Sequence, residues 1–131
     1  MSSYVLDTHA CLFALGSPKK LGARARRALE HADARGEAVW IPAATASEVV
    51  LLKELGRTEL GLPALRKAIE TSSSWRFLPL NFDQIDVFAS LASIRDPFDR
   101  LILSAARVVD GKLISKDAAL AELGMVDVVW A

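Results

Sequence analysis

Four acidic residues in separate parts of the chain are of a type that can hold a metal ion. They are Asp7, Glu48, Asp99 and Asp117. Carboxylates about 4 Å apart repel by roughly 1 kcal/mol in water and by about 4 kcal/mol at an effective dielectric of about 20. A divalent cation removes this repulsion, and an all-oxygen set of ligands suits Mg²⁺ or Mn²⁺. The expected chemistry is attack of a metal-activated water on a phosphodiester, with the metal also stabilising the leaving oxygen.

Each acid also has a simpler explanation as a residue that starts a helix. Asp7 and Asp117 could cap the helices that follow them, and Asp96-Pro97 is typical of an N-cap with proline at the first helical position, with Asp99 in the first turn. The sequence Thr45-Ala46-Ser47-Glu48 matches a capping box, which predicts that Glu48 reaches back to its cap. Taken singly, the acids favour capping; taken together, they favour a metal site.

The elements that must position these acids alternate along the chain. Strands are expected at residues 4–7, 37–41, 76–80, 112–115 and 126–130. Pro79 predicts that the third of these is an edge strand. Alternation of strands and helices predicts an α/β fold with a parallel sheet covered by helices on both faces. In such open sheets ligands bind beyond the carboxyl ends of the strands, which is where Asp7 and Asp117 fall.

The segments between the strands carry apolar residues at helical spacing. The three stripes are Leu21, Ala25, Ala28, Leu29 and Ala32; Ile85, Phe88, Ala89 and Ala92; and Leu101, Ile102, Ala105 and Val109. Residues 55–63 contain two glycines and a proline, which predicts a break between two helices.

Composition limits the class of protein. A length of 131 residues predicts a single domain, 1–131, and 52% hydrophobic residues exclude a disordered chain. Sixteen basic residues balance sixteen acidic ones, so net charge does not indicate a strongly basic nucleic-acid binder. The longest uncharged stretch, residues 8–18, is far shorter than the roughly 20 residues of a membrane span. With only Cys11, no internal disulfide can form, which suits the cytoplasm.

Four motifs together resemble the PIN-domain family, specifically the VapC-type toxin ribonucleases of toxin–antitoxin pairs. The motifs are Tyr4-Val5-Leu6-Asp7-Thr8-His9, Ala46-Ser47-Glu48-Val49, Arg95-Asp96-Pro97-Phe98-Asp99-Arg100-Leu101-Ile102 and Leu113-Ile114-Ser115-Lys116-Asp117. Their order and spacing agree with the family over nearly the whole chain.

The resemblance implies a three-layer α/β/α fold with a central, mostly parallel sheet of about five strands. It also implies an Mg²⁺- or Mn²⁺-dependent endoribonuclease that acts as the toxin of a type II system. Asp7, Glu48 and Asp99 would be the core acids and Asp117 the fourth. Further residues are expected near the metal or the substrate; they are Ser115, which replaces the threonine of many members, Asp96, for which we favour the capping role, and Arg100, which could contact phosphate or pair with an acid.

The resemblance also implies an RNA substrate, a cognate antitoxin and a homodimer. The antitoxin is expected in an apolar groove near the broken helix pair, among Leu51, Leu52, Leu55, Leu60, Leu62 and Leu65, although these leucines could also be ordinary core.

Several other residues are compatible with a structural or a functional role. The basic run is Lys19, Lys20, Arg24, Arg26 and Arg27, which predicts either a solvated helix face or a track for RNA phosphates. The three tryptophans, Trp40, Trp75 and Trp130, are expected in the core rather than against bases. His9 is expected to be structural and Cys11 to be buried.

Two alternatives stay open at this point. The chain could be a PIN-like nuclease that processes DNA or structured RNA, or a PIN module that binds nucleic acid or protein without cutting. A phosphatase of the haloacid dehalogenase type also has an aspartate after its first strand. That class requires a second aspartate two residues later, where this chain has His9.

Overall fold

The computed structural model describes residues 2–131 and contains one five-stranded sheet in which every pairing is parallel. The strands are β1 (Tyr4–Leu6), β2 (Val39–Pro42), β3 (Trp75–Leu78), β4 (Lys112–Ile114) and β5 (Val128–Val129). Their order across the sheet is β3-β2-β1-β4-β5. All five predicted strands are therefore confirmed, with ends that differ by up to two residues. β3 is an edge strand, as Pro79 predicted, and it ends at the residue before this proline.

The central position of β1 determines where the site forms. Tyr4 pairs with Val39 of β2 on one side and with Lys112 of β4 on the other. The N–H of Asp7 donates to the carbonyl of Ile114 at 3.2 Å. Because the strands are parallel, the residues after β1, β2 and β4 meet at one edge of the sheet.

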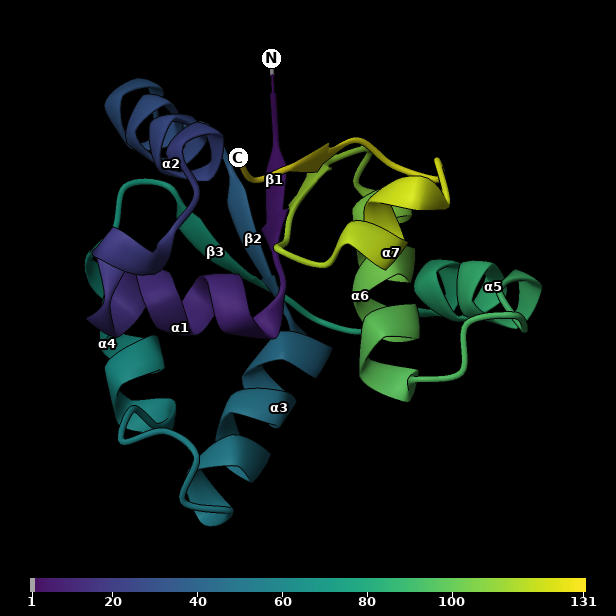
Figure 1. Ribbon diagram of the computed structural model, residues 1–131, viewed down its shortest axis with the longest axis horizontal. Helices are drawn as coiled ribbons and strands as arrows, with labels where there is room; N and C mark the ends of the chain where they lie inside the picture. Colours follow the sequence, from purple (N-terminus) through teal and green to yellow (C-terminus); the bar gives the residue numbers. More distant parts are fainter. Residues whose placement is uncertain (1) are drawn as a thin grey trace.

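Helices cover both faces of the sheet and make the predicted three-layer fold (Figure 1). They are α1 (Thr8–Gly16), the 3₁₀ helix η1 (Pro18–Lys20), α2 (Ala23–Arg35), α3 (Ala43–Glu54), α4 (Leu62–Thr71), α5 (Phe82–Ser90), α6 (Pro97–Val108) and α7 (Ala118–Glu122). The break between α3 and α4 confirms the interruption predicted from Gly56, Gly61 and Pro63. Over residues 2–131, no helix combines the length and the apolar character needed to cross a membrane.

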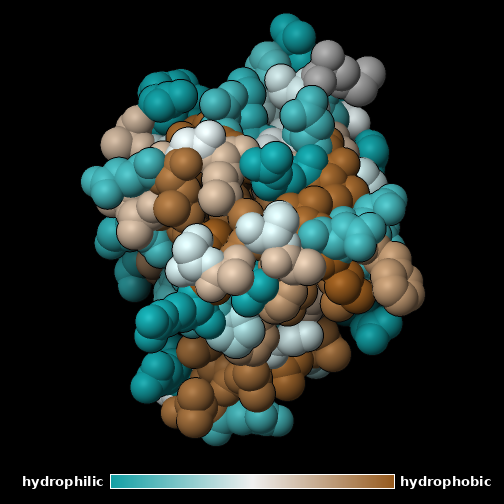
Figure 2. All heavy atoms as spheres, turned by 90° about the vertical axis from the view of Figure 1, so that its right-hand side faces the viewer, coloured by the Kyte–Doolittle hydropathy of each residue, from teal (hydrophilic) through white to brown (hydrophobic). Residues whose placement is uncertain are grey.

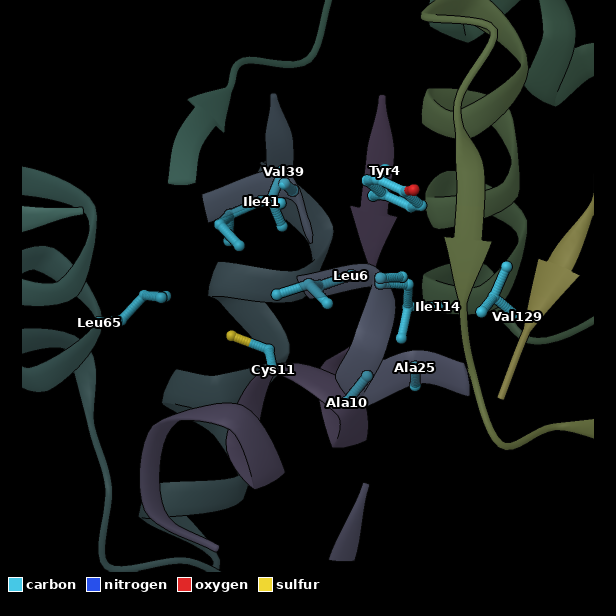
Figure 3. Packing of buried hydrophobic residues seen from close by; sticks show 12 residues of the cluster. Tyr4, Leu6, Ala10, Cys11, Ala25, Val39, Ile41, Leu65, Ile114 and Val129 are labelled. Carbon is cyan, nitrogen blue, oxygen red and sulfur yellow. The ribbon is translucent and has the colours of Figure 1, made fainter. Parts of the chain in front are cut away.

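One layer of the core lies between the sheet and the helices α1, α2 and α4. Tyr4 and Leu6 point into this layer, and Cys11 of α1 and Leu65 of α4 pack there with Ile114 of β4 (Figure 3). Cys11 is fully buried, and burial raises the pKa of its thiol to about 12. The thiol therefore stays protonated and serves as a small core residue, as predicted.

The other layer lies between the sheet and the helices α3, α5, α6 and α7. Val5, which alternates with Tyr4 and Leu6 along β1, packs here against Ile102 and Leu103 of α6. The predicted tryptophan packing is confirmed, since Trp40 contacts this layer and Trp75 and Trp130 contact the first.

The buried face of α5 differs from the predicted one. Ile85 is 41% exposed and Ala89 is also exposed, whereas Gln84 is buried and donates from its side-chain amide to the carbonyl of Pro79 at 2.8 Å. The predicted stripe on this helix is wrong because a polar residue that satisfies a loop carbonyl occupies the inner face.

Candidate active site

All four predicted acids line one cavity of about 480 Å³ at the carboxyl edge of the sheet. Asp7 follows β1, Glu48 lies in α3, Asp99 lies in the first turn of α6 and Asp117 follows β4. In Figure 1, α1 and α3 start just below the strand ends, and α6 lies to their right. The remaining lining residues are Thr8, His9, Phe13, Asp96, Ile102 and Lys116.

Asp7 and Asp117 are both helix caps, as predicted. Asp7 Oδ1 accepts a hydrogen bond from the N–H of Ala10 at 2.9 Å. Asp117 Oδ1 accepts from Ala119 at 2.9 Å and from Leu120 at 3.4 Å. Capping uses one oxygen of each carboxylate, so each group has a second oxygen with which to bind a cation. The two roles considered for these acids are therefore compatible.

The capping box predicted around Glu48 is wrong. α3 begins at Ala43, three residues earlier than the box requires, and Pro42 precedes it without a side-chain cap. The hydroxyl of the buried Thr45 donates instead to the carbonyl of Leu6 at 2.8 Å and ties α3 to the end of β1. Glu48 lies one turn further along and accepts a hydrogen bond from the hydroxyl of Thr8. Its carboxylate is thus oriented by α1 and not by its own helix.

Asp96 caps α6, as predicted, and faces the same cavity as Asp99. Asp96 Oδ1 accepts from the N–H of Asp99 at 3.0 Å, and Pro97 occupies the first turn. Burial is the first cause that raises the pKa of Asp99 from 3.8 to about 6. Negative charge is the second cause, and its sources in decreasing order are Asp96, Asp117, Glu48 and Asp7. The acids therefore lie close enough to repel one another.

Asp7 shows a related effect, balanced by its hydrogen-bond donors. Burial raises the pKa of Asp7, while the Ser115 hydroxyl and the N–H of Ala10 lower it. Ser115 is itself buried, and its hydroxyl also accepts from the N–H of Asp117 at 3.0 Å. Ser115 thus links the two strand-end acids, which agrees with the supporting position expected for it.

Arg100 lies against α5 and not in the cavity. Its Nε donates to the carbonyl of Phe88 at 2.8 Å, and its guanidinium carbon lies 4.0 Å from the centre of the Phe88 ring. The side chain thus joins α6 to α5, and within residues 2–131 it forms no ion pair with an acid. Its contact with phosphate stays a prediction.

The donor chemistry of the cavity fits a hard divalent cation, since carboxylate oxygens from four elements face one space and repel one another. Within residues 2–131, however, no three Asp, Glu, His or Cys side chains are already gathered as ligands of a single ion. The backbone places the acids around one cavity, where the side chains of Asp7 and Asp117 cap helices and that of Glu48 accepts a hydrogen bond from Thr8.

Five lining residues were not predicted as parts of the site, and His9 among them was expected to be structural. Thr8 directly follows Asp7 and is buried, Phe13 lies four residues after His9 on α1, Ile102 lies in α6, and Lys116 precedes Asp117. The spacing of His9 and Phe13, one turn apart on the predicted helix, was the signal available in the sequence. The basic run also reaches this region, because Lys20 Nζ lies 5.6 Å from the centre of the Phe13 ring.

A second cavity, of about 420 Å³, lies between α3, α4 and β3 and is mostly apolar. Its lining residues are Ala43, Ala46, Ser47, Leu62, Leu65, Arg66, Ile69, Glu70 and Phe77. Only Leu62 and Leu65 of the six predicted leucines belong to this groove. Leu51 and Leu55 are 42% and 67% exposed near the end of α3. Figure 1 places this helix in the lower part of the molecule, where Figure 2 shows apolar side chains on the surface.

Comparison with known proteins agrees with this architecture. The chain is 29% identical to ribonuclease VapC22 of Mycobacterium tuberculosis over 122 residues, which cover 92% of this chain and 91% of that protein. Among solved structures, a chain of VapBC2 from Rickettsia felis, bound to a promoter DNA fragment, superposes with a TM-score of 0.72 at 15% identity and covers 98% of this chain and 99% of the other. A toxin–antitoxin complex from Klebsiella pneumoniae gives a TM-score of 0.65 at 20% identity, with 94% of both chains covered. The model of the PIN domain matches residues 4–125, and the chain belongs to the PIN domain family.

Proposed function

We propose that the chain is a single nuclease domain that hydrolyses RNA phosphodiester bonds with a divalent cation and acts as the toxin of a toxin–antitoxin pair. The observation that carries this proposal is the convergence of Asp7, Glu48, Asp99 and Asp117 from four elements on one cavity. The similarity to a ribonuclease over nearly the whole chain supports RNA as the substrate. Cleavage within the RNA strand suits the cavity, because it is open to solvent.

The cation, Mg²⁺ or Mn²⁺, would be held by these four acids and would supply an activated water and charge stabilisation for the leaving oxygen. The chain's own residues orient the ligands. The hydroxyl of Thr8 donates a hydrogen bond to Glu48, and the hydroxyl of Ser115 accepts one from the backbone N–H of Asp117. Because the pKa of Asp99 is raised to about 6, this side chain is largely a carboxylate near neutral pH. Lys116, at the rim of the cavity, is placed to attract a phosphate to an otherwise acidic site.

The test is cleavage of labelled single-stranded RNA by the purified protein. Cleavage should require Mg²⁺ or Mn²⁺, stop in EDTA, and be lost in Asp99→Asn. Asp86→Asn, at an exposed position of α5, is the matched control and should cut normally. Undiminished cleavage in EDTA would contradict the proposed mechanism. A protein that cuts DNA but not RNA would contradict RNA as the substrate.

The apolar groove between α3, α4 and β3 is the surface we propose for the antitoxin. Solved structures that share this fold include toxin–antitoxin complexes. Leu62 and Phe77 are 41% and 47% exposed at this groove, and Arg66 and Glu70 provide a polar border. An apolar face of a partner helix would fit such a groove.

Expression of the chain alone should arrest growth, and co-expression with the small protein encoded next to it should relieve the arrest. Leu62→Asp and Phe77→Asp should weaken the purified complex. Ile85→Asp, at an equally exposed position on α5, is the control. Unchanged affinity of the two groove variants would place the antitoxin on another surface, such as that of Leu51 and Leu55.

We further propose that the protein works in the cytoplasm as a homodimer. Phe82, at the start of α5, is 80% exposed, and Leu80 before it is 46% exposed. An exposed apolar pair of this kind favours self-association. Light scattering should give the mass of a dimer for the wild type and a lower mass for Phe82→Ser. A monomeric wild type at micromolar concentration would contradict the dimer.

A further inference from the structure

The acidic cavity has an aromatic wall on α1 that the proposed hydrolysis does not use. His9 and Phe13 both line the cavity, and their ring centres lie 6.3 Å apart with the planes inclined by 56°. They stand four residues apart and therefore share one face of the helix. The side chain of His9 is exposed, whereas Phe13 is half-buried.

Phe13 is held in place from two sides. Its ring centre lies 6.2 Å from that of Trp130, which packs against the core. Lys20 of η1 approaches the ring from outside, with Nζ 5.6 Å from its centre. The Phe13 ring is therefore fixed, and a cation is kept next to it.

Two lysines are placed near this wall, Lys20 beside the Phe13 ring and Lys116 in the cavity. Lys19 and Lys20 end η1, and Lys116 lines the cavity itself. Arg26 of α2 donates to the carbonyl of Pro18 at 3.4 Å and ties the basic start of α2 to η1. A phosphate chain passing the acids would therefore meet Lys116 in the cavity and Lys20 beside the Phe13 ring.

We propose that His9 and Phe13 form a subsite for an unpaired nucleobase, namely the base next to the phosphate that faces Asp7 and Asp99. This inference rests on the proposed RNA hydrolysis and specifies its substrate as a strand whose base is free to stack. Aromatic rings bind bases of any sequence through their faces, while lysines bind the backbone. His9 is thus a substrate-binding residue, and Phe13 supports it.

Binding measured without catalysis tests the subsite directly. The probes are a labelled ten-nucleotide single-stranded RNA and a ribose-phosphate strand of equal length and charge without bases, both in EDTA. The wild type should bind the RNA about 5- to 150-fold more tightly than the strand without bases, the range expected for one stacked base. His9→Ala should remove most of that ratio, and His9→Tyr, which keeps an aromatic ring, should restore it.

His31→Ala, at the other histidine of the chain, is the matched control, because His31 lies on α2 outside the cavity. Phe13→Leu keeps an apolar contact with Trp130 but should reduce the ratio. Equal binding of both strands by the wild type, or an unchanged ratio in His9→Ala, would overturn the subsite.

A cleavage experiment separates this inference from the proposed function. If the wild type cuts RNA, His9→Ala should raise KM by about the factor by which it weakens RNA binding in EDTA, and kcat should stay within about twofold. A fall in kcat with loss of one limb of its pH profile would make His9 a catalytic acid or base and overturn the binding role. If the wild type cuts no RNA under any divalent cation, the proposed function fails, while the binding ratio in EDTA still decides whether the subsite exists.

Discussion

The hydroxyl of Thr8 donates a hydrogen bond to the carboxylate of Glu48, at an oxygen–oxygen distance of 2.5 Å, across 40 residues of sequence. Thr8 is the first residue of α1 and is only 2% exposed. Glu48 extends from α3 on the other side of the cavity. The hydrogen bond therefore fixes one acid of the site to the residue that directly follows another, Asp7.

Replacing Thr8 with valine should disturb this relationship with little change in volume. Loss of the hydroxyl should cost about 1 kcal/mol of folding free energy. Because Glu48 is then free to turn away, kcat/KM for RNA should fall by about 10- to 100-fold. Urea unfolding and RNA cleavage measure the two effects. Thr71→Val removes an exposed hydroxyl that bonds within its own helix and should leave both unchanged.

The two aspartates of α6 should respond differently to substitution. Asp99→Asn keeps the shape of the side chain but removes the charge, so cleavage should fall by more than about 100-fold while stability holds or rises. Asp96→Asn still caps the helix and should be nearly silent in stability, whereas Asp96→Ala should cost about 1 kcal/mol. An active Asp99→Asn enzyme, or an inactive but stable Asp96→Asn enzyme, would mean that these roles are reversed.

The raised pKa of Asp99 predicts how the stability of the metal-free protein depends on pH. The folded state holds this proton more tightly than the unfolded chain, so the contribution of Asp99 is complete below pH 3.8. It is lost as the pH rises toward about 6, the pKa in the folded state. Urea unfolding in EDTA across this range should show a decline in the wild type that is smaller in Asp99→Asn. Identical curves for the two proteins would contradict the raised pKa.

Gly22, which precedes α2, should not tolerate a side chain. A Cβ at this position would lie 2.1 Å from the carbonyl oxygen of Trp130, which itself accepts from the N–H of Ala25 at 3.0 Å. Gly22→Ala should therefore destabilise the protein by on the order of 2 kcal/mol. Gly61→Ala is the matched control, because Gly61 also precedes a helix but its Cβ would have no contact shorter than 3.6 Å. The measurement is thermal unfolding, and an equal loss of stability in both variants would exclude the predicted clash.

The sequence predicted the strands and acids well because both depend on local patterns. Asp7 follows β1 and Asp117 follows β4, so their meeting at one edge required only that the sheet be parallel. The role of Thr45 could not be predicted, since its partner is the carbonyl of Leu6, which is distant in sequence. The contact of Arg100 with Phe88 could not be predicted either, since it depends on how α5 packs against α6.

The apolar groove was only partly predicted, because the leucine pattern identified α3 and α4 but not the strand beside them. Phe77 belongs to the edge strand β3 and reaches the groove through the packing of α4 on the sheet. A local pattern of leucines cannot include a residue that a separate strand brings into position.

The pairing of β1 with β4 has a consequence during protein synthesis. Asp7 follows the first of these strands, whereas the strand beside it ends at Ile114 and is followed by Asp117. The segment between the two strands must be synthesised before these two carboxylates can meet, and strand pairing over such a sequence distance is slow. A chain that stops before Asp117 therefore lacks the complete set of acids, and metal-dependent cleavage would require synthesis to pass this residue.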